Sequence, residues 1–133
     1  MKKILLIVLL LATSLFADLK KVWATPEFVE KNPQIKIIDI RTPLEWQQTG
    51  IVKGSIPLMF FNEKGQYDIP KFTAALNKVV KKDEPFALIC RTGSRTSKVS
   101  EFLANELGYN VIDLKGGIMN MIRMGYKPVK YLK

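Results

Sequence analysis

Phe86-Ala87-Leu88-Ile89-Cys90-Arg91-Thr92-Gly93-Ser94-Arg95-Thr96 is the stretch from which the fold of this chain is predicted. Its first four residues are apolar and predict a buried strand, and apolar side chains at helical spacing follow Thr96. A strand, a tight loop and a helix in that order place the loop at the carboxyl end of the strand. Open α/β sheets bind ligands there, and the helix N-terminus there is positive. Residues 90–96 are therefore the first candidate for a functional site.

Cys90 is the only cysteine of the chain, and Arg91 and Arg95 lie within five positions of it. Backbone N–H groups, the helix dipole and guanidinium charge all favour the thiolate over the thiol, which predicts a reactive nucleophile. The alternative interpretation is a small apolar residue that ends a core strand. The flanking arginines and Gly93 favour the functional thiol.

The 133 residues contain no histidine. This excludes Ser-His and Cys-His catalytic pairs, imidazole bases and His-ligated metal sites. One cysteine without histidine also argues against a zinc site, so we expect neither a metal nor a cofactor. The activation of Cys90 then has to come from the electrostatics of its own loop.

The first 17 residues have the form of a secretory signal peptide. A basic Met1–Lys3 precedes an unbroken apolar run, Ile4–Leu11, and small residues lead to Ala17. The run is shorter than the roughly 20 residues of a membrane span. We expect cleavage after Ala17 and an exported, periplasmic protein without stable membrane insertion; the alternative is an uncleaved N-terminal anchor. In an oxidising compartment, structural cysteines are usually paired in disulfides. The single Cys90 cannot form an intramolecular disulfide, so it is either inert and buried or reactive.

Residues 18–133 are expected to form one domain of 116 residues. Loss of Lys2 and Lys3 with the leader lowers the formal net charge from +9 to +7. Such a charge suits small anionic partners. Nucleic acid is not expected as a partner, because no aromatic–basic motif occurs.

The remaining pattern alternates strand and helix signals, as a parallel sheet demands. Helices are predicted to begin at Thr25-Pro26 and Thr42-Pro43, where an N-cap residue precedes proline. Pro57 argues that its strand lies at a sheet edge. The predicted strands are residues 22–23, 35–39, 55–58, 86–89 and 111–114. The predicted helices are residues 25–32, 42–50, 70–81 and the segment from the loop to Gly108, with a turn or short helix opening at Gly116-Gly117.

The chain from residue 18 onward resembles a single-domain rhodanese, a sulfurtransferase homology domain. Four segments carry the resemblance in the family's order and spacing. They are Cys90–Arg95 (Cys-Arg-x-Gly-x-Arg), Ile38–Trp46 (Asp-x-Arg…Glu-aromatic), Gly50–Ser55 (Gly-His-Ile-x-Gly-Ala) and Leu114–Ile118 (the closing Gly-Gly). Two positions depart from the family pattern: Ile51 replaces the usual His, and Met121 stands where Trp is common.

The resemblance implies a three-layer α/β fold, with a five-stranded parallel sheet in the order 3-2-4-5-1 and helices on both faces. It also implies a sulfurtransferase. The Cys90 thiolate would take a sulfane sulfur from thiosulfate or a similar anion and pass it, as a persulfide, to a thiophilic acceptor (cyanide in an assay, a thiol or thiol protein in the cell).

The loop residues then have expected roles. Amides from Arg91 through Thr92 to Thr96 would converge on the sulfur. Gly93 would permit a turn that a β-carbon hinders, and Arg91 and Arg95 would orient the anion by forked hydrogen bonds. Other interpretations stay open. The arginines are also compatible with surface or ion-pair positions, and Ser94 and Thr96 with helix capping.

Two further residues are candidates for supporting this loop. Asp39 and Arg41 would brace it from the adjacent strand end, and they fit a structural ion pair equally well.

Three other functions compete with this interpretation. Cysteine phosphatases and arsenate-handling enzymes resemble the loop but place five residues between Cys and Arg, whereas residues 91–94 number four. The shorter ring of amides should fit one sulfur atom better than a tetrahedral oxyanion. The other two are a non-catalytic binding module and a carrier that receives sulfur from a dedicated partner.

Overall fold

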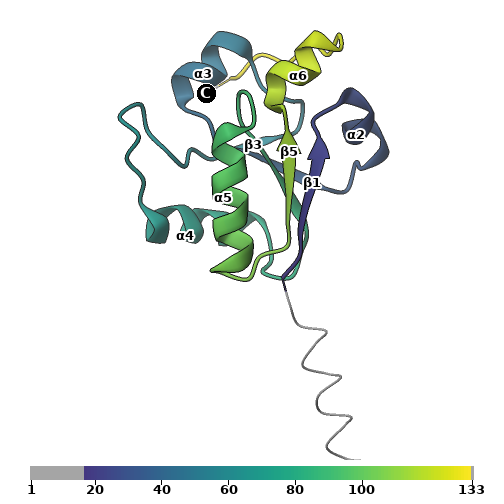
Figure 1. The fold of residues 1–133 in the computed structure, drawn as a ribbon. Helices are drawn as coiled ribbons and strands as arrows, with labels where there is room; N and C mark the ends of the chain where they lie inside the picture. Colours follow the sequence, from purple (N-terminus) through teal and green to yellow (C-terminus); the bar gives the residue numbers. More distant parts are fainter. Residues whose placement is uncertain (1–16, 133) are drawn as a thin grey trace, which may run out of the picture.

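Five strands pair in parallel in the computed structural model, which describes residues 17–132 (Figure 1). Their order is β1-β5-β4-β2-β3, which confirms the order that the resemblance implies. The strands are β1 (Leu19–Trp23), β2 (Lys36–Asp39), β3 (Ile56–Pro57), β4 (Phe86–Ile89) and β5 (Val111–Lys115). The helices are α2 (Pro26–Lys31), α3 (Pro43–Thr49), α4 (Ile69–Val79), α5 (Ser94–Asn105) and α6 (Gly117–Arg123).

The predicted elements are all present, and the largest difference in bounds is at β1. The prediction began this strand at Val22, but the strand begins at Leu19, which pairs with Val111 of β5. Four of its five residues are exposed, so no apolar run marks it in the sequence. β1 is held mainly by its backbone ladder to β5. Pro57 lies on the edge strand β3, as predicted.

The helix starts follow from the caps that the sequence predicts. The Thr25 hydroxyl accepts a hydrogen bond from the Phe28 N–H at 3.0 Å. Thr42 forms a capping box with Glu45, and α3 ends at Gly50, whose φ of +78° a residue with a side chain rarely adopts. Each cap satisfies backbone groups that the helix itself leaves unpaired.

Two apolar clusters lie on opposite faces of the sheet because side chains alternate along each strand. Leu88 and Cys90 belong to the cluster that α4 and α5 cover, together with Ile38 of β2. Ala87 and Ile89 belong to the other cluster, to which α6 contributes Ile118 and Met121 and α2 adds Phe28. The alternation in β4 therefore places the Cys90 side chain beneath α5.

A buried ion pair joins the end of β2 to α3. Asp39 and Arg41 are both fully buried, and Arg41 Nη2 lies 2.8 Å from Asp39 Oδ2. The same guanidinium donates to the Thr49 hydroxyl at 2.6 Å and to the Gly50 carbonyl at 2.8 Å, and the Trp46 indole donates to Asp39 at 3.1 Å. These contacts satisfy both charges and fix the orientation of α3.

The two departures from the family pattern occupy ordinary structural positions. Ile51 pairs with Val129 in an antiparallel bridge, with both N–H···O distances at 2.9 Å. Met121 is fully buried in the cluster beneath α6.

The predicted signal peptide lies, apart from Ala17, outside the residues that the structure describes. Within residues 17–132, no helix is both long enough and apolar enough to span a membrane.

Asp39→Asn should lower the free energy of unfolding by about 3–5 kcal/mol, because it leaves the buried Arg41 guanidinium without its counter-charge. Urea denaturation at neutral pH measures the loss. Asp18→Asn is the control: Asp18 and Lys20 also pair, at 3.9 Å, but their side chains are 63% and 69% exposed. That change should stay within about 0.5 kcal/mol. Equal losses in the two variants would contradict a structural role for the buried pair.

Candidate active site

Cys90 directly follows β4 at the carboxyl end of the sheet, as predicted. Its side chain points to the α5 face and is fully buried, whereas Arg91 and Thr92 next to it are exposed. The sulfur atom is therefore out of contact with solvent, although the next two residues of the loop are exposed. This burial agrees with the apolar interpretation of Cys90, and the polar contacts of the sulfur decide between the two interpretations.

Two polar groups contact the sulfur. The Gly93 N–H donates to Cys90 Sγ, with N and S 3.2 Å apart. The thiol in turn donates to the Thr96 hydroxyl oxygen at 3.7 Å. Among the described residues, Gly93 is the one backbone donor that forms a hydrogen bond to the sulfur, although the prediction had a whole ring of amides converge on it. The sulfur therefore lies in a polar site, in which one backbone amide, that of Gly93, donates to it.

Gly93 is the N-cap residue of α5, and its φ of +98° favours glycine. A β-carbon there would lie 2.8 Å from the Gly116 nitrogen, so the position needs glycine for space as well. No side chain caps α5, which removes capping as the role of Ser94 and Thr96. Thr96 is fully buried, and its hydroxyl donates to the Gly93 carbonyl at 3.3 Å; Ser94 is exposed.

The first turn of α6 holds the loop by its backbone. The N–H of Ile118 donates to the Cys90 carbonyl at 2.9 Å, and the N–H of Met119 donates to the Arg91 carbonyl at 3.1 Å. A β-carbon on Gly117 would lie 2.6 Å from the Cys90 carbonyl oxygen and closer still to that of Arg91. The Gly-Gly motif is therefore needed because two backbones touch here.

Arg95 is held by Glu45 of α3 in a forked ion pair. Both terminal nitrogens of Arg95 lie 2.8 Å from the Glu45 carboxylate oxygens. The hydrogen bond from Arg95 lowers the pKa of Glu45 to about 2. The same bond, and to a smaller extent the Cys90 sulfur, raises the pKa of Arg95. Arg95 thus has a fixed place and a positive charge that acts on the sulfur.

Of the other predicted site residues, Arg91 lies on the surface, whereas Asp39 and Arg41 are fully buried. Asp39 and Arg41 bond to α3 and not to the loop, so their predicted bracing is indirect: they orient α3, and Glu45 of α3 holds Arg95. Asp39 also raises the pKa of Arg95 by its charge.

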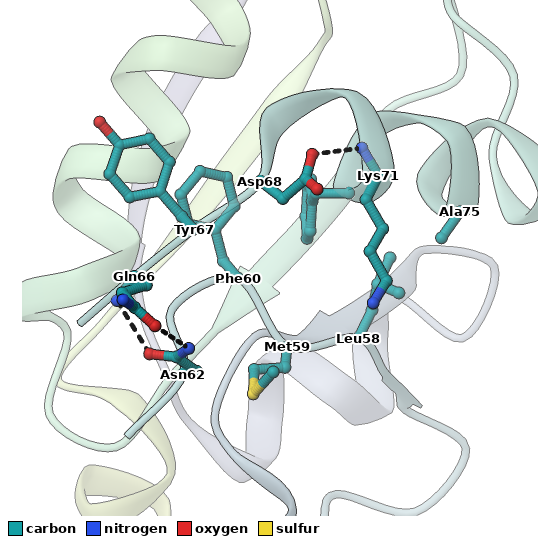
Figure 2. A pocket seen from close by; sticks show the side chains of 10 residues that line it. Leu58, Met59, Phe60, Asn62, Gln66, Tyr67, Asp68, Lys71 and Ala75 are labelled. Atoms are coloured by element: carbon teal, nitrogen blue, oxygen red, sulfur yellow. Dashed lines mark hydrogen bonds between the residues drawn. The ribbon is translucent and has the colours of Figure 1, made fainter. Parts of the chain in front are cut away.

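Several hollows flank the segment that follows β3, and two of them differ clearly in their lining residues. Figure 2 shows one of about 280 Å³, where Asn62 bonds Gln66 and Tyr67 lies against Phe60; no predicted site residue lines it. The other, of about 380 Å³, borders the Cys90 loop. Its lining residues are Phe61, Asn62, Glu63, Gly65, Ser94, Arg95 and Lys98. Arg95 and Lys98 give this hollow positive charge, and Glu63 adds a negative charge.

Two residues that interact with Arg95 or Thr96 are not among the predicted site residues. Glu45 belongs to the Asp-x-Arg…Glu-aromatic motif, and its position three residues after Thr42 is the sequence signal of the capping box that the structure shows. Asp113 is 2% exposed on β5, and an acidic residue inside an apolar strand was the signal for it. Burial raises the pKa of Asp113, while the Thr96 hydroxyl acts to lower it.

Gly117→Ala should displace the loop and destabilise the fold by about 2 kcal/mol or more, because the added methyl group meets two carbonyl oxygens. Thermal unfolding measures this, and the rate of Cys90 alkylation reports the displacement. Gly54→Ala is a matched control: its φ is +80°, and nothing lies within 4 Å of the added atom. It should cost only the backbone strain, about 1 kcal/mol. Equal effects on alkylation in both variants would refute the close packing of α6 on the loop.

The Glu45–Arg95 pair should make stability depend on acid pH. The pKa of Glu45 is lower in the folded chain than its ordinary 4.5, so the pair stabilises the fold above pH 4.5 and loses this contribution as the pH falls toward 2. Over that range the wild type should lose roughly 1–3 kcal/mol more than Glu45→Gln, measured by urea unfolding. The exposed Glu63→Gln should behave like the wild type; identical acid profiles for all three would contradict the pair's contribution.

Comparisons with known proteins found related sequences. The putative sulfurtransferase YtwF of Bacillus subtilis is 30% identical over 96 residues, which cover 72% of this chain and 82% of that protein. The protein HIGH ARSENIC CONTENT 1, mitochondrial, of Arabidopsis thaliana is 30% identical over 102 residues, or 74% of this chain. The match spans 60% of the Arabidopsis protein's length.

A solved structure shows the same fold. The rhodanese-related protein of Thermoplasma volcanium superposes with a TM-score of 0.58 at 26% identity, covering 79% of this chain and 94% of that one. The model of the rhodanese-like domain family matches residues 25–124. That range contains every residue of the Cys90 loop and both glycines that pack on it, and the chain therefore belongs to the rhodanese-like domain family.

Proposed function

We propose that the chain is a sulfurtransferase that moves a sulfane sulfur from thiosulfate, or a similar anionic donor, through a persulfide on Cys90. The observation that carries the proposal is the sulfur site itself: a lone thiol that accepts the Gly93 N–H at the end of β4, beside the fixed charge of Arg95. Membership of the family and a relative named as a putative sulfurtransferase support it.

The reaction has two displacements. The Cys90 thiolate attacks the outer sulfur of thiosulfate, the sulfur–sulfur bond of the donor breaks, and sulfite leaves with the electron pair. An acceptor nucleophile, cyanide or a thiolate, then attacks the outer sulfur of the persulfide and releases the Cys90 thiolate. Each step exchanges one bond to sulfur for another, so no external oxidant or reductant is consumed.

The loop supplies electrostatic help at the sulfur. The Gly93 N–H, whose nitrogen lies 3.2 Å from Sγ, stabilises negative charge on Sγ in the thiolate. Arg95 holds its positive charge in place through Glu45, while Lys98 adds charge along the hollow beside the loop. A dianionic donor gains from each of these charges.

The burial of Cys90 sets the route to the sulfur. Because the thiol is fully buried, a donor reaches it only after part of the loop or of the apolar cluster around it moves aside. This cost favours a small donor. The burial of the thiol also supports a second candidate function. In it, the chain is a carrier that receives sulfur when a partner protein opens the loop, with a thiol protein as acceptor. Under the predicted export signal, either reaction takes place in the periplasm.

Incubation with thiosulfate should add the mass of one sulfur atom to the chain, and cyanide should remove it. Intact-mass spectrometry measures both steps, and Cys90→Ser should gain nothing. An unmodified wild-type mass at saturating thiosulfate would refute transfer from thiosulfate. Uptake from a polysulfide alone would favour the carrier, and a phosphate adduct from a phosphoester probe would favour a cysteine phosphatase.

A further inference from the structure

Asp113 has a feature that the proposed reaction does not use. It lies in β5 opposite Leu88 of β4, on the α5 face of the sheet, which is the face that Leu88 and Cys90 also share. The residue is 2% exposed, and its Oδ1 atom has no hydrogen-bond partner among the residues that the structure describes. A buried oxygen of a carboxylate without a donor is costly, so it calls for an explanation.

Thr96 links this carboxyl group to the sulfur. Its hydroxyl oxygen accepts the Cys90 thiol proton in a hydrogen bond, with S and O 3.7 Å apart. The same hydroxyl acts to lower the pKa of the Asp113 carboxyl, and Thr96 belongs to α5, the helix that packs on the face of β5 where Asp113 lies. The hydroxyl hydrogen of Thr96 now bonds the Gly93 carbonyl at 3.3 Å, a long contact that a rotation about the C–O bond would exchange for Asp113.

We propose, on the basis of the sulfur-transfer function above, that Asp113 is the internal proton acceptor of Cys90 and acts through the Thr96 hydroxyl. The Cys90 proton passes to Thr96 Oγ1, and the Thr96 proton passes to the Asp113 carboxylate. The products are a thiolate and a neutral carboxylic acid. When the acceptor releases the Cys90 thiolate at the end of the cycle, the proton returns by the same path.

This arrangement fits a chain without histidine. General-base help usually comes from imidazole, and none is available here. Burial holds the pKa of Asp113 above its ordinary value, which makes its carboxylate a better base. The thiolate and the carboxylate also need not be charged together, because they share one negative charge.

The charged side chains around Asp113 do not prevent its carboxylate from accepting a proton. Lys21 on β1 and Lys115 on β5 lower its pKa, and Glu101 on α5 raises it. Lys21 and Glu101 bond each other at 3.0 Å, with side chains 43% and 52% exposed, so their effects on the buried carboxyl largely cancel. β4 contributes the apolar Leu88 opposite Asp113.

The test is the pH dependence of Cys90 alkylation by iodoacetamide. An ordinary thiol loses reactivity about tenfold with each pH unit below its pKa. With the relay, the wild type should instead keep a plateau of reactivity between about pH 6 and 7, because Asp113 takes up the proton. Asp113→Asn and Thr96→Val should each lose this plateau and react about 10²-fold more slowly there. Thr96→Ser should retain it, and Asp83→Asn, an exposed carboxylate, should match the wild type.

A faster alkylation of Cys90 in Asp113→Asn would overturn the proposal. If Asp113 acted only as a buried negative charge, its removal would favour the thiolate, and Asp113→Asn would react faster than the wild type below pH 7. A wild-type thiol that does not react below pH 7 would overturn it as well. Thr96→Val gives an independent result where Asp113→Asn fails to fold. If the plateau is present in a chain that takes up no sulfur from thiosulfate, the relay stands and the proposed sulfur transfer fails.

Discussion

The contact between the Cys90 loop and the first turn of α6 is the constraint on which the site depends. The Ile118 and Met119 amides hold the carbonyls of Cys90 and Arg91. Because the carbonyl and the N–H of a trans peptide point in opposite directions, the amides of residues 91 and 92 face away from α6. Gly117 allows the two backbones to come this close. Without that approach the carbonyls would be free to turn toward the sulfur and oppose a negative charge there.

Two ion pairs in series connect this loop to the rest of the sheet edge. The buried Asp39–Arg41 pair orients α3, and Glu45 of α3 then holds Arg95 at the start of α5. A guanidinium that is already paired loses little conformational freedom when a donor arrives, but its carboxylate partner weakens its attraction for anions. Arg95 is therefore better suited to keeping a charge beside the sulfur than to capturing a donor. Arg91 and Lys98, which are exposed, are better placed for capture.

The sequence predicted what depends on local patterns and missed what depends on contacts between distant segments. Strand 86–89, the two threonine caps and the edge position of Pro57 follow from neighbouring residues, and the structure confirms them. The extra residues of β1 depend on a ladder to β5, and the Glu45–Arg95 pair joins residues 50 positions apart. The sequence left open whether Cys90 is a core residue, because its full burial depends on the apolar cluster that α4 and α5 help to form.

The full burial of Cys90 is compatible both with a core residue and with a covered nucleophile. Cysteine packs well as a small apolar side chain, and full burial alone is typical of an inert thiol. An inert thiol, however, needs no polar neighbours, and this one accepts an amide N–H and bonds a buried hydroxyl. On β5, Asp113 adds a buried carboxylate oxygen without a donor among the described residues, which costs about 1–3 kcal/mol if this region serves packing alone. A line of buried polar groups ending at one sulfur is better explained by a charge that forms on that sulfur during a reaction.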